Sequence, residues 1–102
     1  MTRGEVWWFE PPDVKARPVV VLSRDVIAQR SSRITVAFVT STVRGGATEV
    51  GLDHDDGMPR LCVVSLTNIE TVFRGYLTRQ ITTLGPDRMA QICEALKVAV
   101  AC

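Results

Sequence analysis

The sequence predicts a mainly β fold with a C-terminal helix, in which a curved antiparallel sheet or small barrel is capped by that helix. Two observations indicate this fold class. Short apolar runs rich in β-branched residues recur between turns, and a single apolar stripe at helical spacing follows them. A chain in which the strands come first and a single helix comes last is typical of a sheet covered by a helix. With 102 residues, the chain is expected to form one domain, 1–102.

The first strand is expected at 5–9, directly after Gly4, and it contains the adjacent Trp7 and Trp8. Successive side chains of a strand point to opposite faces. At least one of the two indole rings should therefore pack outside the main core, and a second subunit would supply such a contact. Residues 10–13 form a turn that two prolines stiffen.

The second strand, 18–23, is expected to be buried on both faces, because its run of three valines does not alternate with polar residues. Pro18 suits the start of a strand, since it lacks a backbone donor. It also favours an extended backbone at Arg17. Arg17 therefore lies where a loop meets a rigid strand, a position at which a functional cation is well held.

Four further strands show the same β-branched, apolar pattern. The segment 24–32 is expected to be a connecting loop that contains one helical turn. Residues 69–72 either extend the strand before them or form a short partner strand. The four strands are expected at 34–40, 48–52, 61–66 and 81–84.

The terminal helix is expected to begin at Pro86. Proline suits the first helical position, and Asp87 is favourable at the positive end of the helix dipole. The apolar residues that follow recur at helical spacing and define a core-facing stripe. They are Met89, Ile92, Cys93, Leu96, Ala99 and Val100.

Charge is unevenly distributed along the chain, although the net charge is only +1. The segment 15–44 carries a net charge of +5, and the segment 49–56 carries −4. Ten of the twelve basic residues are arginines, whose planar fork of donors suits phosphate. Composition alone leaves two interpretations open: solubility with scattered salt bridges, or a basic face for nucleic acid.

The sequence gives no sign of a membrane or secreted protein. It has no apolar run near the roughly 20 residues that a membrane helix needs, and residues 1–5 lack the apolar stretch of a signal peptide. Three cysteines without a CxxC spacing argue against a disulfide framework or a structural zinc site. A cytoplasmic protein is expected, with Cys62 and Cys93 as small core residues.

Several kinds of catalysis are disfavoured by what the chain lacks. His54 is its one histidine, and the acidic residues around it in 53–56 are more typical of a solvated turn than of a metal site. No Gly-rich phosphate loop is present, and no serine has an evident His–Asp partnership. Cleavage of RNA through its own 2′-hydroxyl remains feasible, because it requires only orientation, proton transfer and positive charge at the phosphate.

Four stretches and the terminal helix together resemble the MazF/PemK family of toxin endoribonucleases, over essentially the whole chain. The most specific part is a strand that begins with Arg17-Pro18, followed by a strand that ends with Thr40-Ser41-Thr42. The four stretches are 4–7, 15–23, 36–42 and 63–72.

The resemblance implies an SH3-like small barrel of the MazF/PemK/CcdB type that forms a homodimer. It implies metal-independent, cofactor-free cleavage of single-stranded RNA at short sequences, with mRNA, tRNA or rRNA as the target. Attack by the 2′-hydroxyl would leave a 2′,3′-cyclic phosphate and a 5′-hydroxyl, and so inhibit translation and growth. It further implies a cognate antitoxin protein that blocks the RNA groove.

The resemblance carries two catalytic positions onto this chain, Arg17 and Thr40. Arginine is almost always protonated, so Arg17 is expected to act as an acid or a charge stabiliser, with Thr40 donating to a phosphate oxygen. The candidate RNA-binding residues are Lys15, Ser41, Arg44 and Asn68.

One family feature is missing. Some members carry an acidic residue on the central strand that has been proposed as the base, and the matching positions here are Ser65 and Thr67. The sequence therefore leaves the base unassigned. A module that binds RNA without cleaving it is one alternative that this departure leaves open.

Other roles remain open at the sequence level. Arg17 could simply pair with Glu5 or Asp13, and Thr40 could cap the local backbone. Trp8, if exposed, could stack on an RNA base. A toxin of the same fold that binds DNA gyrase, as the CcdB type does, is a further alternative, but residues 98–102 contain no tryptophan to anchor it.

Overall fold

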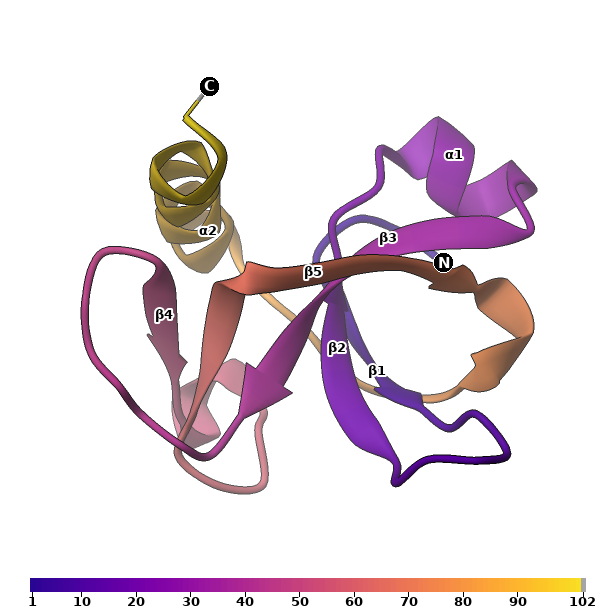
Figure 1. The fold of residues 1–102 in the computed structure, drawn as a ribbon, viewed down its shortest axis with the longest axis horizontal. Helices are drawn as coiled ribbons and strands as arrows, with labels where there is room; N and C mark the ends of the chain where they lie inside the picture. Colours follow the sequence, from indigo (N-terminus) through magenta and orange to yellow (C-terminus); the bar gives the residue numbers. More distant parts are fainter. Residues whose placement is uncertain (102) are drawn as a thin grey trace.

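A single antiparallel sheet of six strands forms the body of the molecule, and one long helix lies across it (Figure 1). The computed structural model describes residues 1–101, so Cys102 lies outside the described residues. The strand order is β4-β5-β3-β2-β1-β6. The elements are β1 (Glu5–Phe9), β2 (Arg17–Val21), α1 (Asp25–Arg30), β3 (Arg33–Thr40), β4 (Glu49–Leu52), β5 (Cys62–Phe73), β6 (Leu77–Thr83) and α2 (Pro86–Val100), with short 3₁₀ turns at His54–Asp56 and Arg74–Tyr76. The predicted fold class, mainly β with a C-terminal helix, is confirmed.

Strand β2 is buried on both faces, as the valine run predicts, and most of β3 is buried as well. Val19, Val20 and Val21 have no exposed surface. Because the sheet is coiled, it encloses a core on each side. The core under α2 includes Val6, Val20, Ala37, Val64, Leu66, Met89, Ile92 and Ala95. The second core, under α1, consists of Val19, Val21, Ala28, Ile34, Val36, Phe38, Val72 and Leu77.

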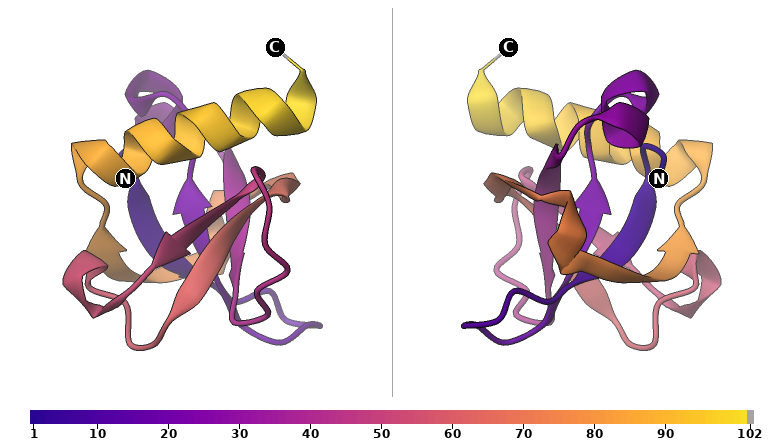
Figure 2. Two further views of the ribbon diagram at one scale, coloured as in Figure 1. Left: turned by 90° about the vertical axis from the view of Figure 1, so that its left-hand side faces the viewer. Right: turned by 90° about the vertical axis from the view of Figure 1, so that its right-hand side faces the viewer.

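Helix α2 closes the first core from above, and both side views show it lying across the coiled strands (Figure 2). It begins at Pro86, as predicted, and buries Met89, Ile92 and Ala95. Cys62 is buried, as expected, but Cys93 is only partly buried and its sulfur accepts a hydrogen bond from Arg3 at 2.8 Å.

Strand β5 is continuous, so residues 69–72 extend the predicted strand rather than forming a partner. Its pairing with β3 jumps, because Ala37 faces Ile69 whereas the next residue, Phe38, faces Ser65. The extra residues form a bulge that bends the strand sharply, which is visible where β5 crosses the molecule in Figure 1. Leu66 enters the first core, and Thr67 and Asn68 are left exposed.

Two elements are longer than the sequence predicts. Strand β6 begins at Leu77 rather than at 81, because an edge strand paired only with β1 can carry polar residues such as Arg79. Helix α1 has six residues where one turn is expected, and its Ala28 packs into the second core. The Arg74 guanidinium donates to the Ala28 carbonyl and ties the helix to the chain after β5.

No helix within residues 1–101 has the length and apolar character that crossing a membrane requires.

Candidate active site

Arg17 and Thr40, the two residues expected to be catalytic, lie next to each other in the sheet. Arg17 begins β2 and Thr40 ends β3, and the two strands run antiparallel with Val19 paired to Phe38. Continuing this register by two residues sets Arg17 opposite Thr40. Residues directly opposite in an antiparallel pair share one face of the sheet, so the two side chains border the same surface.

Two surface hollows meet at this pair. The first, the polar hollow, has a volume of about 410 Å³, and the second, the basic hollow, about 550 Å³. Arg17 and Thr40 border both, so they stand between the two. The polar hollow is also bordered by Thr42, Arg44, Gly45, Thr48, Glu49, Ser65, Thr67 and Asn68. The basic hollow is also bordered by Trp8, Lys15, Ala16, Pro18, Val39, Ser41, Met58, Pro59, Arg60 and Cys62.

The four candidate RNA-binding residues divide between the hollows. Lys15 and Ser41 border the basic hollow, whereas Arg44 and Asn68 border the polar hollow. The structure therefore brings all the residues singled out in the sequence to one continuous surface.

An aromatic ring, rather than a carboxylate, holds the Arg17 side chain. The guanidinium carbon lies 4.5 Å from the centroid of the Phe38 ring, which is itself 4% exposed in the second core. Within residues 1–101 no ion pair involves Arg17, and Glu5 instead accepts hydrogen bonds from Thr2 and Trp7. A ring orients a cation without neutralising it, so the charge of Arg17 stays available to an anion.

The Thr40 hydroxyl has one local contact that leaves it free to donate. Its oxygen accepts the backbone N–H of Thr42 at 3.1 Å, which is the backbone-capping role considered above. A hydroxyl both donates and accepts. Its hydrogen is therefore available to an oxygen in either hollow, and the two roles of Thr40 are compatible.

The bulge of β5 supplies one wall of the polar hollow. It turns Thr67 and Asn68 outward beside Ser65, whose hydroxyl lies 3.2 Å from that of Thr67. The positions where an acid is missing are thus occupied by a pair of hydroxyls that contact each other. The register jump that places them arises from the pairing of β3 with β5, which no local sequence pattern indicates.

Glu49 is a site residue that the sequence does not reveal. Its carboxylate accepts the backbone N–H of Gly45 at 2.8 Å and that of Arg44 at 3.2 and 3.3 Å. These hydrogen bonds hold the loop after β3 at the edge of the polar hollow. In the sequence, Glu49 belongs to the acidic segment 49–56, and only the pairing of β4 with β5 brings it opposite Ser65.

Trp8 and Arg60 border the basic hollow although they lie in segments that are distant in the sequence. The two tryptophans are both half-buried: Trp7 packs against the second core and donates to Glu5 at 2.8 Å, while Trp8 borders the hollow. Arg60 lies in the turn before β5, outside the basic segment 15–44. Its proximity to Lys15 is therefore a product of the fold.

Cys62 borders the basic hollow but is poorly suited to act as a nucleophile. Burial raises the pKa of its thiol, and the charge of Asp56 raises it further, while Arg60 opposes the shift. The thiolate is the reactive form of cysteine, so this side chain stays protonated near neutral pH.

The acidic turn after β4 exposes His54 and Asp55, as expected of a solvated turn, but two of its aspartates are tied to the terminal helix. Asp56 is 11% exposed and pairs with Arg88 of α2 at 3.0 Å, and Asp53 lies 3.6 Å from the same guanidinium. A third hollow, of about 610 Å³, lies beside this network, but its arginine is already neutralised. In the described part of the chain, no three His, Cys, Asp or Glu side chains are grouped closely enough to hold a metal ion.

The fold and the site together define a class of protein: a small coiled sheet that presents an unpaired arginine and a hydroxyl where two surface hollows meet, an arrangement suited to a phosphodiester. The family is settled by comparison. Residues 2–100 match the family described as PemK-like, MazF-like toxin of type II toxin-antitoxin system, and the chain belongs to that family.

Similar proteins agree with this assignment. The probable endoribonuclease MazF5 of Mycobacterium tuberculosis is 46% identical over 101 residues, which is 98% of this chain and 93% of that protein. The structure of the Mycobacterium tuberculosis toxin MazF-mt6 superposes with a TM-score of 0.87 at 36% identity, covering 95% of this chain and 96% of the toxin. An endoribonuclease in complex with its cognate antitoxin from a mycobacterial species shares the fold, with a TM-score of 0.90 at 24% identity over 99% of this chain and 95% of that one.

Proposed function

We propose that this chain is the toxin of a type II toxin–antitoxin system and a sequence-specific, metal-independent endoribonuclease, formed by one domain, 1–102. The observation that carries the proposal is the position of Arg17, unpaired and beside Thr40, between two hollows large enough for nucleotides. Membership of the family, with a relative named as a probable endoribonuclease at 46% identity, supports the same conclusion.

The reaction uses the nucleophile that RNA already carries. The 2′-hydroxyl loses its proton and forms a bond to the adjacent phosphorus, while the bond to the 5′-oxygen breaks and that oxygen gains a proton. The products are a 2′,3′-cyclic phosphate and a 5′-hydroxyl. Arg17 stabilises the negative charge that grows on the phosphoryl oxygens, and Thr40 donates a hydrogen bond to one of them.

The proposed partners follow from the same assignment. The RNA is single-stranded, since the bases must leave a duplex to enter hollows of this size, and its cleavage stops translation and growth. The toxin works in the cytoplasm as a homodimer, and a cognate antitoxin protein blocks it. The antitoxin complex of the mycobacterial endoribonuclease of the same fold supports this last point.

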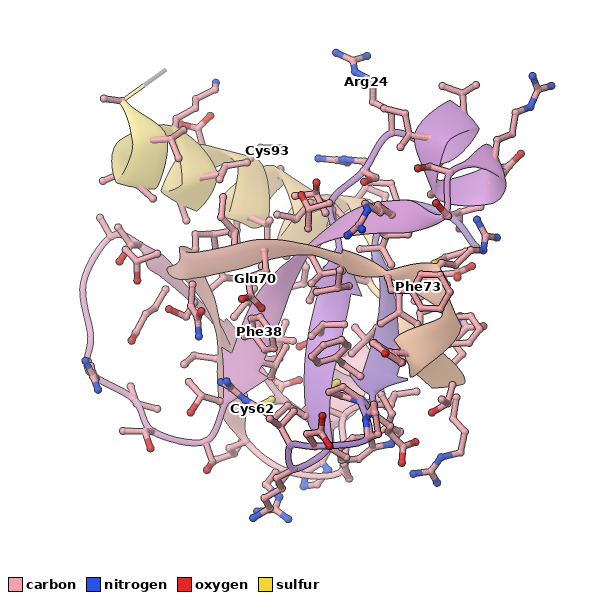
Figure 3. The ribbon with its side chains drawn as sticks, turned by 45° about the vertical axis from the view of Figure 1, so that its right-hand side comes forward. Arg24, Phe38, Cys62, Glu70, Phe73 and Cys93 are labelled. Carbon is pink, nitrogen blue, oxygen red and sulfur yellow. The ribbon has the colours of Figure 1, made fainter. Side chains whose placement is uncertain are left out.

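The test is cleavage of a long, unstructured RNA by the purified protein in EDTA, with the new ends mapped and their chemistry determined. We expect cuts at a short recurring sequence, with cyclic phosphate ends. Arg24→Ala is a matched control, because Arg24 lies beside α1, far from Cys62 and the basic hollow (Figure 3).

Two results would contradict the proposal. Intact RNA with wild type and Arg17→Ala alike would exclude the nuclease, and a supercoiling assay on the same sample would then identify a gyrase poison. Salt-dependent binding of RNA without cleavage would instead identify an RNA-binding module that lacks catalysis.

A further inference from the structure

The two hollows beside Arg17 differ in their chemistry. The basic hollow is bordered by three cations, Lys15, Arg17 and Arg60, and by no acidic residue. The polar hollow is bordered mainly by hydroxyls and an amide, with Glu49 balancing one of its two arginines. Cations that contact phosphates carry no sequence information, whereas amides and hydroxyls can distinguish base edges.

Trp8 gives the basic hollow an aromatic wall. Arg79 of the neighbouring strand β6 lies over its ring, 5.7 Å from the centroid, and Arg79 forms an exposed ion pair with Glu10 at 3.3 Å. A tryptophan side chain has few torsions, so it loses little freedom when a base stacks on it. Stacking tolerates any base, because every base has a π-face.

The polar hollow has the opposite character. Asn68 projects from the β5 bulge, and its amide offers both a donor and an acceptor. The bulge sets where Asn68 leaves the strand, and the hydrogen bonds of Glu49 tie the backbone of Arg44 and Gly45 to the other side of this hollow. A base that matches the amide gains hydrogen bonds, whereas a mismatch leaves polar groups unpaired.

We infer that the two hollows divide the RNA between them, an inference that rests on the nuclease function proposed above. The basic hollow is a sequence-tolerant nucleotide subsite, in which a base stacks on Trp8 while Lys15 and Arg60 bind phosphates. The polar hollow is the specificity subsite, in which Asn68 reads a base on the other side of the cleaved phosphate.

The stacking contact can be tested without cleavage. The probe is a single-stranded oligonucleotide of the mapped cleavage sequence with a 2′-deoxy residue at the cut, titrated against intrinsic fluorescence. The chain has two tryptophans, so each single Phe variant reports the other one. We expect quenching to persist in Trp7→Phe, where Trp8 remains, and to disappear in Trp8→Phe. Quenching that disappears in Trp7→Phe and persists in Trp8→Phe would overturn the assignment of the basic hollow.

The division of roles can be tested by mapping cleavage. Arg60→Gln should weaken cleavage equally at all sites and lower the salt slope of probe binding by about 0.7, while Arg24→Gln changes neither. Asn68→Ala should keep that slope and reduce the preference for one base beside the cut by about 10- to 100-fold. If Arg60→Gln alters the cleavage sequence, or Asn68→Ala leaves it unchanged, the division is wrong.

Failure of this inference and failure of the nuclease proposal give different results. A wild-type protein that binds the long RNA without cutting it contradicts the nuclease. In that case a single-stranded oligodeoxynucleotide replaces the probe, and the same two tryptophan variants still decide whether Trp8 stacks. If the wild-type protein is a nuclease but Arg60→Gln alters the cleavage sequence and Asn68→Ala does not, only the division between the hollows is contradicted.

Discussion

Two arginines at separate places on the surface show how one residue type serves two purposes. Arg88, on the first turn of α2, lies between Asp56 at 3.0 Å and Asp53 at 3.6 Å. Its hydrogen bond to Asp56 raises the pKa of the guanidinium, and the nearby carboxylate charges add to the shift. Arg17 has no carboxylate partner within residues 1–101 and lies instead on the Phe38 ring.

The difference indicates a structural role for Arg88 and a phosphate-binding role for Arg17. Two carboxylates neutralise Arg88, so its hydrogen bonds tie the turn after β4 to the terminal helix and little of its charge remains for a ligand. The aromatic ring orients Arg17 but leaves its charge unneutralised. An incoming phosphate does not have to displace a carboxylate at Arg17, whereas it would at Arg88. Substitutions at the two arginines should therefore separate activity from stability.

The largest effect is expected at Arg17. Arg17→Ala should reduce RNA cleavage by about 100- to 1,000-fold, because it removes a preorganised charge from the transition state. The midpoint of urea unfolding should fall only slightly, since no ion pair is lost and only the contact with the Phe38 ring is removed. Single-turnover cleavage and urea titration measure the two quantities. A stable and fully active Arg17→Ala variant would contradict the assignment of Arg17 to catalysis.

Arg88→Ala should show the reverse pattern. It leaves the largely buried carboxylate of Asp56 without its main partner, and we expect the free energy of unfolding to fall by about 1–2 kcal/mol. Cleavage per folded molecule should not change. Urea unfolding with parallel activity measurements tests this, and Lys97→Ala, which removes the exposed pair with Glu94, is the control that should leave stability nearly unaltered.

Phe38→Leu should weaken the orientation of Arg17 while keeping an apolar side chain in the core. We expect kcat to fall by about 2- to 30-fold with KM little changed, and Phe38→Tyr, which keeps the ring, to restore it. The Arg17 side-chain NMR signals should also move when the ring current is removed. Phe9→Leu removes a ring that contacts Phe38 edge-on, and unmoved Arg17 signals are expected there. A shift of equal size in both variants would point to general loosening of the core.

The smallest effect concerns pH. Burial raises the pKa of Asp56, but hydrogen bonds from Arg88 and from the backbone of Asp53 outweigh it, so the pKa lies below its ordinary value. A lowered pKa in the folded state means that the contribution is present above the ordinary carboxyl pKa of about 3.9 and is lost as the pH falls further. The stability difference between wild type and Asp56→Asn should be constant near neutral pH and shrink below about pH 4.

The sequence predicted correctly what depends on local patterns. The valine run of β2 indicated burial on both faces, and Pro86 with the apolar stripe indicated the helix that closes the first core. The sequence placed Arg17 at the start of one strand and Thr40 at the end of the next. Adjacent antiparallel strands bring such ends together, so this proximity follows almost directly from the order of the elements.

The remaining features depend on pairings between distant segments. The bulge that exposes Asn68 arises from the register between β3 and β5, and polar residues at the start of β6 give no alternation to detect. Glu49 and Arg60 were not among the predicted site residues, because nothing near them in the sequence indicates which loop they will approach.

The sequence by itself determined a β-rich fold, its terminal helix and the family to which the chain belongs, because these rest on residue types and short-range spacing. Only the tertiary structure decided which arginine is neutralised and which is not. Arg88 forms an ion pair with Asp56 because the fold brings the turn after β4 against the terminal helix. Arg17 stays unpaired because the fold brings no carboxylate within residues 1–101 against it, only the Phe38 ring. The residues next to Arg88 and Arg17 in the sequence predict neither outcome.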